Sequence, residues 1–99
     1  MKNVSFKLTK FQLEEVCHKL SIVVDEPDLC ADYSFTKSEA NDLEAIFLNA
    51  KPGQFIVTAK QAVVIAGELD NAADICRDNS YSSAVRSFSM VVDAINKQL

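Results

Sequence analysis

The sequence has few of the residues from which recognisable active sites are built. Its 99 residues include one histidine, two glycines, two prolines, three cysteines and no tryptophan. Phosphate-binding loops need clustered glycines, whereas Gly53 and Gly67 stand far apart. Zinc sites usually contain a closely spaced pair of cysteine or histidine ligands, and the sequence has no such pair. We therefore predict neither a metal nor a cofactor.

Long apolar segments are also missing. No apolar run approaches the ~20 residues that a membrane-spanning helix needs. Residues 1–7 have neither the apolar core nor the cleavage site of a secretory signal. The cysteines Cys17, Cys30 and Cys76 are odd in number and widely spaced, which is typical of reduced thiols. These features predict a cytoplasmic protein that does not act at membranes.

The sequence shows no arrangement typical of an enzyme. His18 follows Cys17, but adjacent positions on a helix point about 100° apart, so the two are not placed as a nucleophile and its base. Glu14 lies one helical turn before His18 and is predicted to pair with it on the surface. The acidic residues from 25 to 32 lack the glycine and the terminal glutamate of a calcium loop, and Pro27 interrupts them. We predict that the chain is not an enzyme.

The composition is that of one globular domain. Apolar residues make up 48% of the chain and charged residues 24%, which are ordinary values for a folded protein. A chain of 99 residues is long enough for one hydrophobic core. Because most of the apolar periodicity is helical, we predict an all-α fold, a compact four-helix domain that spans residues 1–99.

Residues 58–99 predict an antiparallel helical hairpin at the C-terminus. Apolar residues recur there at spacings of three and four, and the short link at residues 78–80 makes the two helices neighbours. The first helix of the hairpin is rich in small residues and apolar around most of its girth, so we expect the other three helices to pack on it. Gly67 costs about 1 kcal/mol relative to alanine in a helix, which predicts a closely approaching neighbouring backbone.

Three capping boxes mark helix starts. Each has a threonine followed three residues later by glutamine or glutamate: Thr9 with Gln12, Thr36 with Glu39, and Thr58 with Gln61. The first box predicts a helix over residues 10–22 or 10–23, with Phe11 facing inward. The second predicts a helix over residues 37–50.

Two short segments remain ambiguous between strand and extended chain. Residues 3–8 alternate between polar and apolar side chains, as in a half-buried strand. Residues 55–57 either pair with them in a small sheet or form an extended link tucked into a helical core.

The negative charge is concentrated in one fifth of the chain. The formal net charge is −4, but residues 25–44 contain seven acidic residues and one lysine, a net of −6. Residues 1–24 carry a net of +2, and residues 45–99 are balanced. A surface charged in this way repels nucleic acid and anionic membranes and attracts a basic protein.

This acidic segment is the candidate partner-binding site. It is either a solvated loop followed by the outer face of a helix, or an interface that combines carboxylates with aromatic anchors. We weigh these two interpretations evenly. The candidate site residues are Asp25, Glu26, Asp28, Asp32, Tyr33, Asp42 and Glu44.

In size, acidity and lack of motifs, the whole chain resembles the small cytoplasmic immunity proteins of bacterial contact-dependent growth inhibition. The resemblance implies an inhibitor that binds and neutralises a cognate toxin domain, often a basic nuclease. An alternative is a non-enzymatic adaptor or homodimeric structural module. It would use the serine-rich side of the last helix or the excess apolar surface of the preceding one. We favour a monomer.

Overall fold

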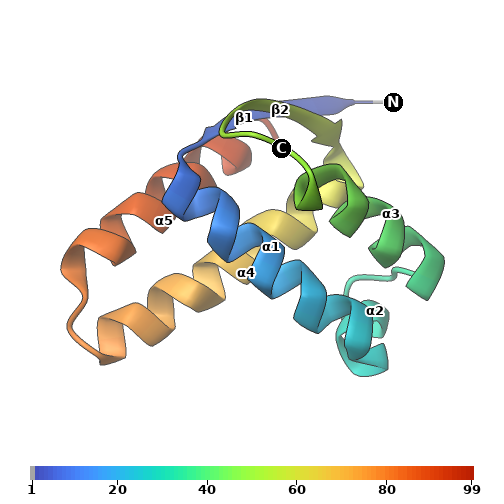
Figure 1. Ribbon diagram of the computed structural model, residues 1–99, viewed down its shortest axis with the longest axis horizontal. Helices are drawn as coiled ribbons and strands as arrows, with labels where there is room; N and C mark the ends of the chain where they lie inside the picture. Colours follow the sequence, from blue (N-terminus) through green and yellow to red (C-terminus); the bar gives the residue numbers. More distant parts are fainter. Residues whose placement is uncertain (1) are drawn as a thin grey trace.

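The computed structural model describes residues 2–99 and contains, within that range, five helices and two strands (Figure 1). About 70% of the chain is helical. The elements in chain order are β1 (Asn3–Leu8), α1 (Lys10–Asp25), α2 (Pro27–Asp32), α3 (Lys37–Leu48), β2 (Gly53–Thr58), α4 (Ala59–Asp78) and α5 (Ser82–Asn96). The predicted helical character is confirmed, whereas the purely four-helix architecture is wrong because α2 and a small sheet are added to it.

All three capping boxes are formed, and they begin α1, α3 and α4. In each box the threonine hydroxyl accepts a hydrogen bond from the backbone N–H three residues on, at 3.1–3.2 Å. The glutamine or glutamate side chain accepts one from the threonine N–H, at 2.8–3.0 Å. These reciprocal bonds satisfy backbone donors that have no partner inside a helix. The predicted helix starts are therefore confirmed.

The two ambiguous segments form an antiparallel sheet. Strand β1 pairs with β2 in a register that places Phe6 opposite Phe55 and Leu8 opposite Gly53. The sheet covers one end of the helices (Figure 1). Its inward side chains are buried, and Phe55 packs on Phe47 of α3 with ring centroids 4.8 Å apart. A two-stranded ribbon is marginally stable alone, so these contacts with the helices hold the sheet in place.

Helices α4 and α5 form the predicted antiparallel hairpin (Figure 1). Leu69 of α4 and Ile95 of α5 are fully buried in the core. The expectation that all other helices pack on α4 is only partly met, because α3 packs chiefly against α1. Tyr81 caps the start of α5 with its side chain 64% exposed, so it does not extend the buried stripe of that helix.

Helix α1 lies across the hairpin and carries α3 on its other side. Val16, Leu20 and Val23 supply its buried positions. Phe11, predicted to face inward, is 50% exposed and stacks on Phe88 of α5 with a centroid distance of 5.2 Å. Its position in the first turn of α1 places it at the rim of the core. Within residues 2–99, no helix combines the length and apolar character required to cross a membrane.

Candidate functional site

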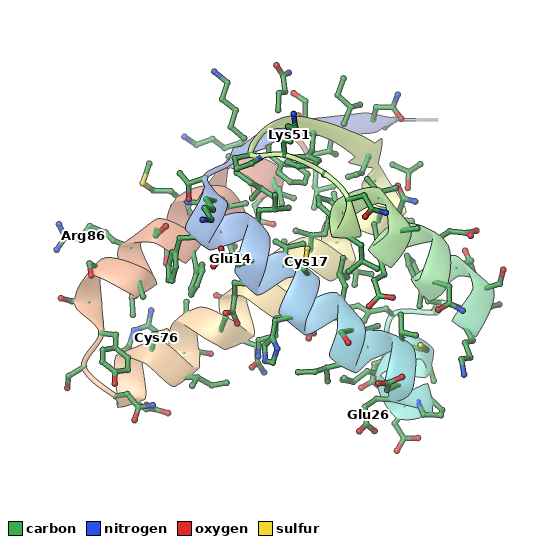
Figure 2. All side chains as sticks on the ribbon, in the orientation of Figure 1. Glu14, Cys17, Glu26, Lys51, Cys76 and Arg86 are labelled. Carbon is green, nitrogen blue, oxygen red and sulfur yellow. The ribbon has the colours of Figure 1, made fainter. Side chains whose placement is uncertain are left out.

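Four of the predicted site residues lie together where α1 meets α2. Asp25 ends α1, Glu26 caps both helices, and α2 contains Asp28 and Asp32. All four side chains are exposed, and Glu26 is labelled at this end of the molecule in Figure 2. Pro27 produces the corner, because a proline disfavours helical geometry at the preceding residue and is tolerated at the start of a helix. We call Asp25, Glu26, Asp28 and Asp32 the acidic corner.

The acidic corner is not neutralised by ion pairs with other described residues. Among residues 2–99, the two ion pairs join Lys60 to Glu39, at 2.9 Å, and Arg77 to Asp74. Neither pair includes a member of the corner. Lys37 lines the same 240 Å³ pocket as Asp25 but lies beyond ion-pairing distance. The corner therefore presents four negative charges to solvent.

The backbone beneath the corner is held by buried groups. The Cys30 thiol is buried and donates to the Val23 carbonyl oxygen at 3.1 Å, which ties α2 to the last turn of α1. After α2, the Phe35 N–H donates to the Cys30 carbonyl oxygen at 2.8 Å, and the Phe35 ring is buried. These contacts fix the direction in which α2 presents its carboxylates. Sequence reasoning predicted a loop here and missed the helix.

Asp42 and Glu44 do not share one face of α3. They flank the buried Leu43 in the sequence. Residues two positions apart in a helix are rotated by about 200° around its axis, so the two side chains point in different directions. Glu44 is half-buried and faces α1, where its charge contributes to a raised pKa of the Cys17 thiol. Asp42 is exposed on the other flank. The structure thus groups four of the six predicted carboxylates and separates these two from each other.

Tyr33, predicted as an aromatic anchor for a partner, has an internal hydrogen bond. Its hydroxyl donates to Oε2 of Glu68 at 2.6 Å, and the Glu68 side chain is 8% exposed. The ring lies against Gly67 of α4, where an added Cβ would stand 2.6 Å from the hydroxyl oxygen. The close neighbour that Gly67 admits is therefore a side chain, not the expected backbone. A partner-binding role for the exposed part of Tyr33 stays a prediction.

The contact between Tyr33 and Glu68 predicts a loss of stability at high pH. Burial first, and then the hydrogen bond to Glu68, raise the pKa of Tyr33 above its ordinary value of about 10. The stabilisation is therefore fully present below pH about 10 and is lost as the pH rises above the pKa of the unfolded state. We expect the urea midpoint to fall above pH 10 in the native protein and to fall less in Tyr33→Phe. An equal decrease of the urea midpoint with pH in both proteins would contradict this role for Tyr33.

The cysteines and the histidine do not converge on a reaction centre. The Cys17 thiol donates to the Phe47 carbonyl oxygen at 3.4 Å, Cys30 is buried, and Cys76 is half-buried on α4. His18 is exposed, and the predicted ion pair with Glu14 does not form between these described residues. Within residues 2–99, no group of three or more histidine, cysteine or acidic side chains is placed to hold a metal ion.

Cys17 is expected to react slowly with electrophiles. Burial, and secondarily the charge of Glu44, raise the pKa of its thiol, which lowers the fraction of reactive thiolate. Iodoacetamide at pH 8 should therefore alkylate Cys17 more slowly in the folded protein than in urea, as followed by peptide mass spectrometry. Equal rates in the two states would show that the environment of Cys17 does not protect it.

Gln12 has a second role that sequence reasoning missed. Besides completing the first capping box, its amide nitrogen donates to the carbonyl oxygen of Ser87 at 3.0 Å and to the Ser87 hydroxyl at 2.9 Å. Gln12 is buried, and these bonds tie α1 to α5. Part of the serine-rich side of the last helix is thus engaged within the protein. The pattern of a capping box predicts the local bonds of Gln12 but carries no signal for this long-range one.

Comparison with protein-family models, with curated proteins and with solved structures finds no significant match to this chain.

Proposed function

We propose that this protein is a cytoplasmic immunity protein that binds a cognate, basic toxin domain through the acidic corner and thereby neutralises it. The observation that supports this function best is the charge of the corner. Four exposed carboxylates lie within residues 25–32, and none is in an ion pair with another described residue. A toxin that cleaves nucleic acid has a positive cleft for phosphates, and carboxylates at this density complement such a cleft.

The local structure beneath the corner favours binding. Because the Cys30 thiol and the buried Phe35 ring hold α2 in place, little backbone freedom is lost when a partner binds. The Tyr33 hydroxyl fixes the other end of α2 on α4 through Glu68. The interface would include the exposed Asp42 at its edge, whereas the half-buried Glu44 would contribute less. A basic partner would be steered to the corner by charge and held there by contacts with a rigid surface.

We expect the gene immediately upstream to encode a large secreted protein with a basic C-terminal domain, and the functional test is co-expression of that domain with this protein. We expect that domain to arrest growth when expressed alone and growth to recover when this protein is present. The two proteins should then purify as a stoichiometric complex. Persistent growth arrest in cells that contain both folded proteins would contradict the immunity function.

The alternative of a homodimeric structural module is favoured by one specific observation, the exposed apolar side chains of α4. Val63 and Ile75 are each about half exposed, although most other apolar side chains of this helix are buried. Sedimentation velocity of the purified protein separates the two functions. A monomer at micromolar concentration agrees with the inhibitor, and a tight dimer supports the structural module.

A further inference from the structure

The outer edge of β1 has backbone groups that β2 does not use. In an antiparallel pair, alternate residues direct both their N–H and their C=O towards the partner strand. The N–H of Ala59 donates to the Lys2 carbonyl oxygen at 3.1 Å, and the register continues this pairing through the even-numbered residues of β1. Asn3, Ser5 and Lys7 therefore direct their backbone groups away from β2.

Gln98 already occupies one position on this outer edge. Its side-chain oxygen accepts from the Ser5 N–H at 3.0 Å, and its nitrogen donates to the Ser5 carbonyl oxygen at 2.6 Å. The amide of Gln98 thus makes the two hydrogen bonds that a peptide group of a third strand would make. The next outward-facing residue of β1 is Lys7, and no described side chain makes the corresponding bonds to its backbone.

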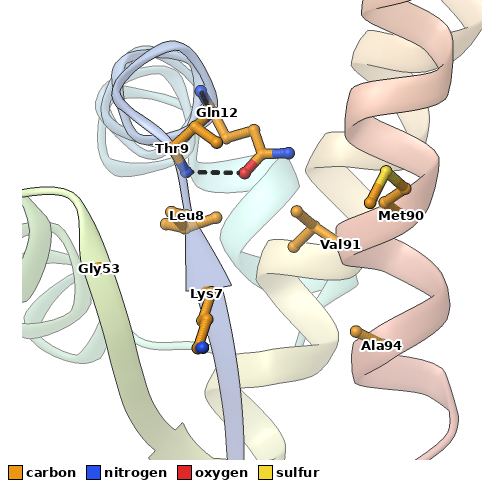
Figure 3. Close-up of a pocket in the computed structure, with 8 residues that line it drawn as sticks. All are labelled: Lys7, Leu8, Thr9, Gln12, Gly53, Met90, Val91 and Ala94. Atoms are coloured by element: carbon orange, nitrogen blue, oxygen red, sulfur yellow. Dashed lines mark hydrogen bonds between the residues drawn. The ribbon is translucent and has the colours of Figure 1, made fainter.

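The edge at Lys7 opens into a groove of about 550 Å³ (Figure 3). One wall is the end of β1 and the start of α1, and the other is α5. Met90, Val91 and Ala94 line the α5 wall, and Met90 is 68% exposed. The groove thus combines unpaired strand backbone with an apolar surface opposite it. This combination is typical of sites that bind an extended peptide as an added strand.

The charge near the groove favours an acidic occupant. Residues 1–13, which supply β1 and the start of α1, contain three lysines and no acidic residue, whereas α5 contains one charge of each sign, Arg86 and Asp93. Lys7 is the one charged residue that lines the groove. A second copy of this chain is disfavoured, because antiparallel pairing of β1 with its own copy around Lys7 would place two lysines opposite each other.

We propose that this groove binds an extended, acidic segment of a partner protein. The segment would pair with the backbone of Lys7, continue the row of bonds that Gln98 begins at Ser5, and place apolar side chains against Met90 and Ala94. Its carboxylates would lie near the Lys7 ammonium group. This binding surface is separate from the acidic corner, and it does not depend on the immunity function.

The test uses three blocked pentapeptides and amide chemical shifts of the ¹⁵N-labelled full-length protein. The first peptide is acetyl-EVTVE-amide, the second is acetyl-KVTVK-amide, and the third is the acidic peptide with a methylated nitrogen at threonine. We expect the acidic peptide to shift the amide signals of Lys7, Thr9 and Met90. The lysine peptide should bind about fivefold more weakly, as expected from one exposed ion pair. The methylated peptide should show no saturable shift, since it cannot donate to the Lys7 carbonyl oxygen.

Two protein variants with the same change of charge complete the test. Lys7→Glu should reverse the preference between the acidic and the lysine peptide. Lys51→Glu alters a lysine at the same end of the molecule that does not line the groove (Figure 2), and it should leave the preference unchanged. The proposal is overturned if no peptide shifts these signals at millimolar concentration, or if all three peptides bind equally. Concentration-dependent shifts of the same signals without peptide would assign the groove to a second copy and would also overturn it.

Discussion

Replacement of Gly67 by alanine is expected to lower the free energy of unfolding by about 1–3 kcal/mol, although the same change in the middle of most helices raises it by about 1 kcal/mol. The added Cβ would stand 2.6 Å from the Tyr33 hydroxyl oxygen and 3.2 Å from the nearest ring carbon. Tyr33 has to move, and its hydrogen bond to the buried Glu68 is weakened or lost. Urea unfolding followed by circular dichroism measures the effect.

A double-mutant cycle with Tyr33→Phe identifies the cause. Tyr33→Phe alone leaves the buried Glu68 carboxylate without its donor and should cost about 1–3 kcal/mol. It also removes the atom closest to the added Cβ, so Gly67→Ala should cost about 1 kcal/mol less in the phenylalanine protein than in the native one. Strictly additive effects of the two changes, or a stabilising Gly67→Ala, would show that Tyr33 is not the constraint on Gly67.

Neutralisation of the acidic corner is the second change with a large expected effect. The combined replacement of Asp25, Glu26 and Asp28, together with Asp32, by the corresponding amides should slow association with the basic toxin domain at least about tenfold at low salt. The fold should be little changed, because all four side chains are exposed and none is in an ion pair with a described residue. Stopped-flow fluorescence measures the association rate.

The chain offers a matched control for this variant. Asp70, Asp74, Asp78 and Asp93 are also exposed, and they lie on α4 and α5, outside the corner; Asp74 pairs with Arg77 on the surface. Their replacement by asparagine changes the net charge by the same four units but leaves the corner intact. We expect a much smaller effect on the association rate. An equal loss in both variants would attribute binding to the total charge, and no loss in the corner variant would exclude the corner as the interface.

The local features of the fold could be predicted from the sequence. A capping box requires only residues three apart, so Thr9, Thr36 and Thr58 predict the starts of three helices correctly. The short link after α4 likewise predicts the helical hairpin. The pairing of β1 with β2 was left open, because the choice between a strand and an extended segment depends on contacts between distant parts of the chain.

The candidate site depends more on tertiary structure, so less of it could be predicted from the sequence. Charge counting finds the acidic corner, because its four carboxylates are close in sequence. It does not show that Asp42 and Glu44 lie on different flanks of α3, since that depends on which side of Leu43 is buried. The bond between Tyr33 and Glu68 joins residues 35 positions apart, and neither residue has a local pattern that indicates it. The bonds of Gln98 to Ser5 span 93 positions and were missed for the same reason.

The most direct test of the acidic corner as a binding surface is the salt dependence of association between this protein and the basic toxin domain. Charge steering between exposed groups is screened by salt. The association rate of the native protein should therefore fall at least about tenfold between low salt and about 0.5 M sodium chloride, and that of the corner variant should fall much less. A native association rate that does not change with salt, or a corner variant with the same salt dependence as the native protein, would contradict the account.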